Sequence, residues 1–167
     1  MAVLLLIDLD HFKTINDALG HQVGDMVLQA VAQRLREAVG ERSLFARLGS
    51  DEFGLLLTNE ASQSHGMAEL AEELAQRILA AISRPVFVEE RAFNVGASIG
   101  MALFPENGDT ELDVMRHADM ALHQAKVRKR GSLQLYQVSF QDQAAKRLRL
   151  GDGLRKAISH DELELYF

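Results

Sequence analysis

The chain has 167 residues and a formal net charge of −6, and 47% of its residues are hydrophobic. This length suits one domain with a substantial core, and the composition is ordinary for a soluble protein of mixed helices and strands. The absence of cysteine excludes a disulfide scaffold and thiolate metal sites. The acidic charge disfavours a nucleic-acid partner, and no apolar run approaches the roughly 20 residues that span a bilayer. We therefore expect no membrane contact from this segment.

The chain opens on an almost continuously apolar run, residues 2–9, which is typical of a strand buried on both faces in the middle of a sheet. Because a domain seldom begins with its central strand, we expect a further segment to precede residue 1. Asp8 and Asp10 end the run, and residues two apart on a strand point to the same face. The strand therefore presents an acidic pair at one end.

A second acidic pair occupies the tip of a predicted β-hairpin. Two short apolar stretches, residues 44–46 and 53–57, flank a tight turn at residues 49–52 that ends in Asp51 and Glu52. If the hairpin lies beside the first strand, the two acidic pairs meet at one spot. Such a cluster of hard oxygen ligands suits Mg²⁺ and a phosphate-bearing substrate.

The remaining elements follow from apolar periodicity and from turn residues. We predict helices over residues 11–20, 26–39, 67–82 and 111–125, and strands over residues 86–88, 93–95, 97–104 and 133–136. Ser62 or Ser64 is expected to cap the third helix, and Thr110 the fourth. This order predicts an α/β (α+β) fold in which helices flank a mixed central sheet and a β-hairpin carries the acidic turn.

The composition changes near the end of the chain. From Ser139 onward the sequence is polar and helical in pattern, rich in Gln, Arg and Lys, and interrupted by Gly151 and Gly153. It resembles a linker more than part of a core. We therefore divide the chain into a domain at residues 1–138 and a linker helix with the beginning of a further domain at residues 139–167.

Each acidic or basic feature also has a simpler explanation. An acid pair after a buried strand also occurs in receiver domains and in phosphatases of the haloacid dehalogenase type. These phosphatases usually have Thr or Val at the position where this chain has Phe12. Asp51 and Glu52 alone are compatible with a solvated hairpin tip. The basic run from Lys126 to Arg130 is compatible with a solvated helix end favoured by the helix dipole.

Several short motifs, taken together in this order and spacing, resemble the GGDEF family of diguanylate cyclases over residues 3–136. They are Asp8-Leu9-Asp10-His11-Phe12-Lys13, Asn16-Asp17, Gly20-His21, Gly24-Asp25, Arg47-Leu48-Gly49-Ser50-Asp51-Glu52-Phe53, Ser98-Ile99-Gly100, Ala118-Asp119 and Ala125-Lys126. Residues 154–158 and 162–167 resemble the opening of an EAL domain, the cyclic di-GMP phosphodiesterase that often follows a GGDEF domain.

The resemblance implies a palm-like fold similar to class III nucleotide cyclases. Two facing domains, a homodimer, would each hold one GTP, and the two molecules would condense to cyclic di-GMP. Asp8 and Asp51 would bind Mg²⁺ or Mn²⁺ through their side chains, joined by the Leu9 carbonyl. Glu52 would assist at the metal or in activating the 3′-hydroxyl, and Lys13 would take part in catalysis.

The same resemblance assigns the nucleotide contacts. Asn16 and Asp25 would read guanine, since an amide and a carboxylate match its donors and acceptors. The phosphate contacts would come from three cations, from backbone N–H groups and from the signature turn: Lys13, Lys126 and Arg130, the N–H groups around His11 and Phe12, and Gly49 with Ser50. A helix N-terminus after Asp10 adds a favourable partial charge for phosphate.

The chain departs from the family pattern at the second glycine of the signature, which is Ser50. A side chain in the left-handed conformation that glycine tolerates costs on the order of 1 kcal/mol. The helix that normally precedes the first strand is also missing, which we expect to leave an apolar face exposed and to promote self-association.

Two functions follow from the resemblance. The first is a bacterial, cytoplasmic diguanylate cyclase domain, within a parent protein that another segment could anchor to a membrane. The second is a GTP-binding module without turnover that controls a C-terminal EAL phosphodiesterase. The metal acids and phosphate cations favour the enzyme, whereas Ser50 and the EAL-like tail favour the module. A purely structural interaction domain gives no reason for all of these residues to stand at matching positions.

Overall fold

The computed structural model describes residues 1–40, 43–58, 66–88, 90–141, 149–150, 152, 155 and 157–160. It divides the chain into two compact units, Met1–Tyr136 and Gln137–Phe167. In the second unit the described residues are largely helical. The EAL-like residues 162–167 lie outside the described part, as do residues 154 and 156 of the stretch 154–158.

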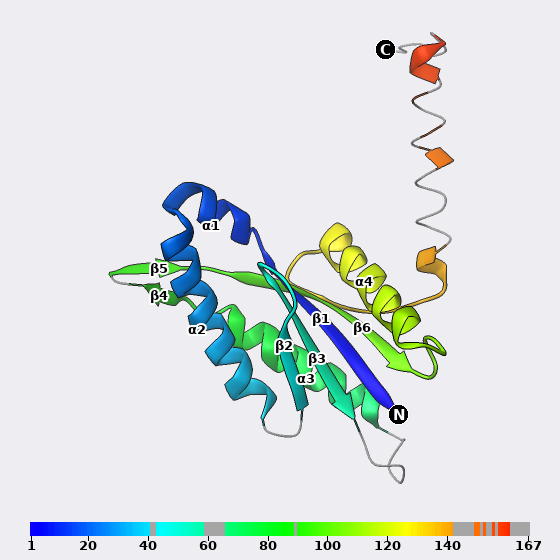
Figure 1. The fold of residues 1–167 in the computed structure, drawn as a ribbon, viewed down its shortest axis with the longest axis horizontal. Helices are drawn as coiled ribbons and strands as arrows, with labels where there is room; N and C mark the ends of the chain where they lie inside the picture. Colours follow the sequence, from blue (N-terminus) through cyan, green and yellow to red (C-terminus); the bar gives the residue numbers. More distant parts are fainter. Residues whose placement is uncertain are drawn as a thin grey trace. The chain divides into compact units, whose positions relative to one another are not determined.

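The first unit is a sheet flanked by helices (Figure 1). Its elements, in chain order, are β1 (Ala2–Asp10), α1 (Phe12–Leu19), α2 (His21–Val39), β2 (Ser43–Arg47), β3 (Glu52–Thr58), α3 (Met67–Ile82), β4 (Val86–Val88), β5 (Arg91–Phe93), β6 (Gly96–Phe104), α4 (Glu111–Arg128) and β7 (Leu133–Leu135). The predicted mixed α+β architecture is confirmed.

Five strands form the main sheet in the order β2-β3-β1-β6-β7. Among the described strands of this sheet, β6 and β7 pair in parallel and the other neighbours pair antiparallel, and β1 lies in the middle between β3 and β6. This position explains why the first strand is apolar throughout. A short ribbon of β4 and β5 stands apart from the main sheet.

The two faces of β1 meet different helices. Val3, Leu5, Ile7 and Leu9 are at most 1% exposed and belong to the core built with α2 and α3. The residues that alternate with them point to the opposite face, where α4 lies. Asp8 is therefore directed toward α4 by the pleat of the strand.

Helix α4 packs unusually close to the sheet at Gly100. A Cβ atom added to Gly100 would lie 2.2 Å from the Ala118 carbonyl oxygen and 2.3 Å from the Leu122 nitrogen. These are backbone atoms that cannot move aside without shifting the helix. Glycine at this position therefore sets the distance between α4 and β6.

Some predicted boundaries differ from the structure. Helix α2 begins at His21, not after Asp25, and Gly20, with φ of 84°, separates it from α1. Gly66 precedes the first residue of α3, and the two serines expected to cap this helix lie outside the described residues. The strand expected at residues 93–95 is instead β5, Arg91–Phe93. Thr110 caps α4 as predicted, since its Oγ1 accepts a hydrogen bond of 3.1 Å from the Asp113 N–H.

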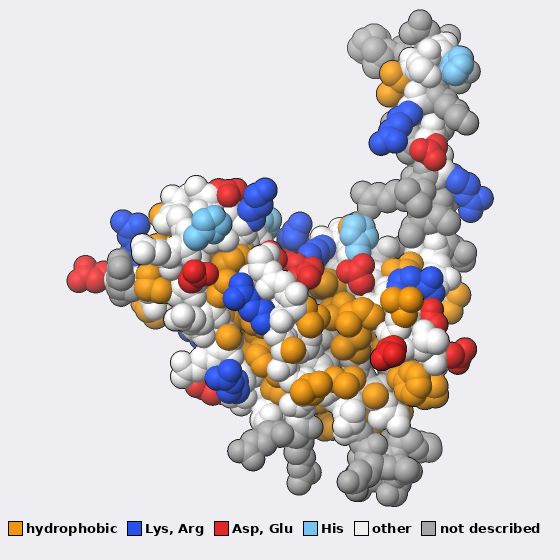
Figure 2. All heavy atoms as spheres, in the orientation of Figure 1, with side chains coloured by type: hydrophobic (Ala, Val, Ile, Leu, Met, Phe, Trp, Pro, Cys, Tyr) orange, Lys and Arg blue, Asp and Glu red, His pale blue; other side chains and the backbone are white. Residues whose placement is uncertain are grey.

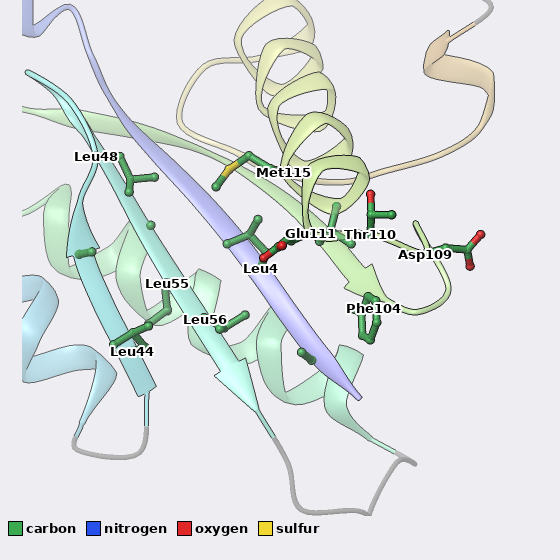
Figure 3. A pocket seen from close by; sticks show the side chains of 14 residues that line it. Leu4, Leu44, Leu48, Leu55, Leu56, Phe104, Asp109, Thr110, Glu111 and Met115 are labelled. Atoms are coloured by element: carbon green, nitrogen blue, oxygen red, sulfur yellow. The ribbon is translucent and has the colours of Figure 1, made fainter.

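An apolar hollow of about 720 Å³ lies on the α4 side of the sheet. Strands β1, β2 and β3 supply its floor, and the first turns of α4 supply one wall (Figure 3). Leu44 is 69% exposed, Leu48 50% and Met115 42%. Hydrophobic side chains gather on this face (Figure 2). The described residues therefore include exposed apolar side chains on this face of the sheet.

Candidate functional site

A buried ion pair marks the end of β1. The Nζ atom of Lys126, in the last turn of α4, lies 2.7 Å from Oδ2 of Asp8. The Asp8 side chain is only 9% exposed and the Lys126 side chain 26%. A partly buried ion pair is screened less by salt than one at the surface. Asp8 is therefore held in a strongly polarised environment at the edge of the core.

Burial raises the pKa of Asp8 above its ordinary value, because a carboxylate out of water loses hydration. The hydrogen bond and the charge of Lys126 lower the pKa, but they do not offset this loss. The negative charges of Asp51 and Asp10 raise the pKa further. Asp8 is therefore costly to ionise in the folded chain, chiefly because of its burial and despite its ion pair with Lys126.

The hairpin tip lies directly beside this acid. In the antiparallel register of β1 and β3, Asp8 stands opposite Glu52. The Leu9 N–H donates a hydrogen bond of 3.0 Å to the Asp51 carbonyl oxygen. These two contacts connect the end of β1 to the signature turn. The predicted proximity of the strand end and the hairpin tip is found in the structure.

The turn itself is organised by Arg47 and Ser50. The Arg47 guanidinium donates to the carbonyl oxygens of Gly49, at 2.9 Å, and Ser50, at 2.8 Å. The Ser50 hydroxyl donates to Oδ1 of Asp51 at 2.7 Å. Among the described residues His11 is the one non-glycine residue with positive φ, so Ser50 is not in the left-handed region. The strain expected for Ser50 is therefore absent.

Asp10 has a separate set of partners, which the sequence did not reveal. Its Oδ1 accepts from the Ser98 hydroxyl at 2.9 Å and from Arg130 at 3.2 Å. Its Oδ2 accepts from the Gly131 N–H at 3.0 Å. Asp10 thus anchors the segment after α4, and Arg130, expected at the phosphates, contacts a carboxylate in this structure.

The residues expected to read guanine lie where α1 and α2 meet. A Cβ atom added to Gly24 would lie 1.8 Å from the Asn16 side-chain oxygen, so the Asn16 amide packs directly over Gly24. Asp25 is the next residue and is exposed. The structure therefore brings Asn16 close to the residue that precedes Asp25.

The loop between β1 and α1 has one strained residue. His11 adopts φ of 60° and ψ of 18° immediately before α1. Phe12 is buried and anchors the start of the helix, whereas Lys13 is exposed. The turn thus places Lys13 on the surface within a few residues of the acidic end of β1.

The carboxylate and carbonyl oxygens at this site are of the type that binds a hard divalent cation, but in this structure they are not arranged as a complete set of metal ligands. Carboxylates and a backbone carbonyl are the ligands that Mg²⁺ prefers. In the part of the chain that the structure describes, no three His, Cys, Asp or Glu side chains are grouped as metal ligands. Asp8 and Asp51 are adjacent through the backbone contacts above, and Lys126 occupies one oxygen of Asp8.

The fold and these motifs agree with a known family. A family model described as "Diguanylate cyclase, GGDEF domain" matches residues 1–132. The chain belongs to the GGDEF family. The matched residues run from the start of the chain to the residue before β7, and they include the hairpin tip described above.

The relatives of this GGDEF domain are signalling proteins. The chain is 39% identical over 164 residues to MucR of Pseudomonas aeruginosa, named a bifunctional diguanylate cyclase/cyclic di-GMP phosphodiesterase. It is 39% identical over 137 residues to the diguanylate cyclase TpbB of the same species. The chain spans 23% of MucR and 30% of TpbB. It therefore corresponds to a small part of each relative.

Solved structures support the same fold. A structure of a truncated TpbB that comprises only the GGDEF domain matches with a TM-score of 0.79 and 38% identity, over 86% of this chain and 81% of that one. In the described residues, no helix has both the length and the apolar character needed to cross a membrane.

Proposed function

We propose that this GGDEF domain binds GTP and condenses two GTP molecules to cyclic di-GMP with Mg²⁺, or Mn²⁺ in its place. The observation that carries the proposal is the junction of β1 and the hairpin, where the Leu9 N–H binds the Asp51 carbonyl and Asp8 faces Glu52. This junction gathers carboxylates beside Lys126 at the edge of the sheet. Phosphoryl transfer needs this combination of metal-binding acids and phosphate-binding cations.

The acids would perform the metal and proton chemistry. Asp8, Asp51 and the Leu9 carbonyl would hold the cation, which when bound neutralises phosphate charge and makes the 3′-hydroxyl a better nucleophile. Glu52 would accept the proton of the 3′-hydroxyl group of one GTP, while the oxygen of that hydroxyl group attacks the α-phosphorus of the other GTP. Pyrophosphate would leave from the opposite side of that phosphorus.

The cations would hold the triphosphate. Lys13 and Lys126 would neutralise its charge, together with the N–H groups of His11 and Phe12. Arg130 carries five N–H donors, so one guanidinium can serve Asp10 and a phosphate oxygen together. Gly49 and Ser50 would add contacts from the turn; a Cβ atom added to Gly49 would have the Glu52 side chain as its nearest neighbour, at 3.2 Å.

The base would lie at the α1–α2 junction. Asn16 offers a donor and an acceptor, and the Asp25 carboxylate can accept from the N1–H and exocyclic amine of guanine. Because each domain holds one GTP, the condensation requires two facing copies, and we propose a homodimer in the bacterial cytoplasm as the active form.

The test is incubation of the 167-residue chain, and of the natural protein that carries it, with GTP and Mg²⁺, followed by chromatography. Any phosphodiesterase in the longer protein is inactivated so that product is not consumed. The proteins without substitution are expected to form cyclic di-GMP. The Asp51→Ala variants are expected to form none, and an unchanged circular dichroism spectrum would show that they are still folded. Product formation by Asp51→Ala at the parent rate would refute the metal assignment.

A second candidate is a GTP-binding module that regulates a C-terminal EAL phosphodiesterase. The match to MucR extends over 164 residues, whereas the match to TpbB, named only as a diguanylate cyclase, covers 137. This difference supports a division into a GGDEF domain at residues 1–138 and a linker with the start of an EAL domain at residues 139–167. Saturable GTP binding without product, accompanied by a change in phosphodiesterase rate, would establish this function.

A further inference from the structure

The ion pair between Lys126 and Asp8 places a phosphate-binding cation on a metal-binding acid. Nζ of Lys126 is 2.7 Å from Oδ2 of Asp8, within hydrogen-bonding distance. If Asp8 holds a cation and Lys126 holds phosphate, as proposed above, these two roles conflict at this oxygen. A positive ammonium and a divalent cation cannot share one carboxylate oxygen without strong repulsion.

We propose that Lys126 is an exchangeable counter-ion, which pairs with Asp8 until nucleotide phosphate draws it away and thereby couples metal binding to nucleotide binding. This inference rests on the proposed function, because it assumes that Asp8 is a metal ligand. It assigns Lys126 a part in the order of binding as well as in holding phosphate.

The chemistry of lysine suits such an exchange. Its ammonium is a compact charge on a flexible stem with rotatable donors, so it can change partners by side-chain rotation alone. Lys126 is 26% exposed, which leaves it a path toward a ligand arriving from solvent. It lies in the last turn of α4, where the helix dipole stabilises a positive charge.

The neighbouring pair shows the contrast. Asp10 accepts hydrogen bonds from Arg130, from the Gly131 N–H and from the Ser98 hydroxyl. Removing Arg130 would leave Asp10 two partners, whereas Lys126 is the side chain that compensates Asp8. Asp10 is therefore held by several hydrogen bonds at once. Asp8 pairs with the side chain of Lys126, which a metal cation could replace.

The consequence is a binding order. With Lys126 on Asp8, the divalent cation alone meets a carboxylate that is already neutralised, and binds weakly. A triphosphate gives Lys126 an alternative anion and frees the Asp8 oxygen. Cation and nucleotide therefore each strengthen the binding of the other, as linkage requires.

The experiment measures Mn²⁺ binding to the 167-residue chain without nucleotide, by electron paramagnetic resonance titration. Three proteins are compared: the parent, Lys126→Met, and Lys129→Met as a control that removes the same charge from an exposed lysine at the end of the same helix. We expect Mn²⁺ to bind Lys126→Met at least about tenfold more tightly than the parent. Lys129→Met is expected to bind Mn²⁺ like the parent.

A second titration with guanosine α,β-methylene triphosphate, which cannot be condensed, separates the possible failures. If the parent binds Mn²⁺ in the presence of this analogue and Lys126→Met shows no gain without it, the counter-ion role is wrong and the proposed function stands. If the protein does not bind Mn²⁺ even in the presence of the analogue, the counter-ion role of Lys126 and the proposed function are both wrong. Lys126→Gln, which keeps a donor to Asp8 without the charge, replaces Lys126→Met if the latter fails to fold, and is expected to show a gain of the same sign.

Discussion

The Ser50 hydroxyl donates a hydrogen bond of 2.7 Å to Oδ1 of Asp51, its neighbour in the signature turn. Ser50, the residue where the resemblance leads us to expect glycine, is thus in contact with the acid that follows it. Since Ser50 does not have a positive φ, the turn accommodates this side chain without backbone strain. Ser50 therefore acts on the orientation of the Asp51 carboxylate rather than on the shape of the turn.

Replacing Ser50 tests this orientation. Ser50→Ala removes a hydrogen bond worth about 1 kcal/mol, so we expect the rate of cyclic di-GMP formation to fall about fivefold. The free energy of unfolding should change by less than about 0.5 kcal/mol, because Ser50 is exposed. Ser50→Thr keeps the hydroxyl and should retain more of the rate. Equal rates for the parent and Ser50→Ala would show that the hydrogen bond does not matter for turnover.

The raised pKa of Asp8 predicts how stability depends on pH. The folded protein holds this proton more tightly than the unfolded chain, whose pKa is near 3.8. Ionised Asp8 therefore lowers the free energy of unfolding. The full loss is present at pH values above the raised pKa, and it disappears at pH values below 3.8. Without metal, Asp8→Asn should be more stable than the parent at pH 7, and this gain should shrink as the pH falls toward 3.8. Urea unfolding in EDTA at both pH values measures it, and a less stable Asp8→Asn at pH 7 would contradict the prediction.

The packing of Asn16 over Gly24 predicts a loss of guanine binding in Gly24→Ala. The added methyl group would occupy the place of the Asn16 amide and displace it. We expect affinity for a non-condensable GTP analogue with Mg²⁺ to fall about tenfold, the equivalent of about 1.4 kcal/mol. In an Asn16→Ala background the same substitution should have little further effect. Additive losses would mean that Gly24 acts independently of Asn16.

The close approach of α4 predicts that Gly100→Ala destabilises the fold by about 2–3 kcal/mol, because the new Cβ meets helix backbone. Gly49→Ala is the matched control. There the nearest atom is the flexible end of Glu52 at 3.2 Å and φ is ordinary, so the cost should stay below about 1 kcal/mol. Urea unfolding of both variants measures the difference. Similar losses at the two positions would show that α4 can move away from the sheet.

Local rules predicted much of this architecture. The two-residue period of a strand was enough to direct Asp8 and Asp10 to one face, and Thr110 is a cap that sequence alone identifies. The start of α2 was missed because its first two residues, His21 and Gln22, are polar and exposed, and because Gly24 interrupts the helical pattern. A helix end without an apolar face or a capping side chain gives no pattern to detect.

Contacts between distant residues could not be predicted in the same way. Arg130 and Asp10 are 120 residues apart in the sequence, and only the folded chain shows that they pair. The hydrogen bonds from Arg47 to the carbonyl oxygens of Gly49 and Ser50 likewise become apparent only in the structure. Family spacing pointed to candidate site residues, but not to the partners that hold them in this structure.

The exposed apolar floor formed by Leu44 and Leu48 has a thermodynamic consequence. Anything that covers this face binds the folded chain and not the unfolded one, and so shifts the unfolding equilibrium by mass action. The melting temperature should therefore vary with the concentration of whatever covers the face, including the protein itself if it associates there. Stability becomes a property of the chain together with its surroundings, and a single measured value describes only one set of conditions.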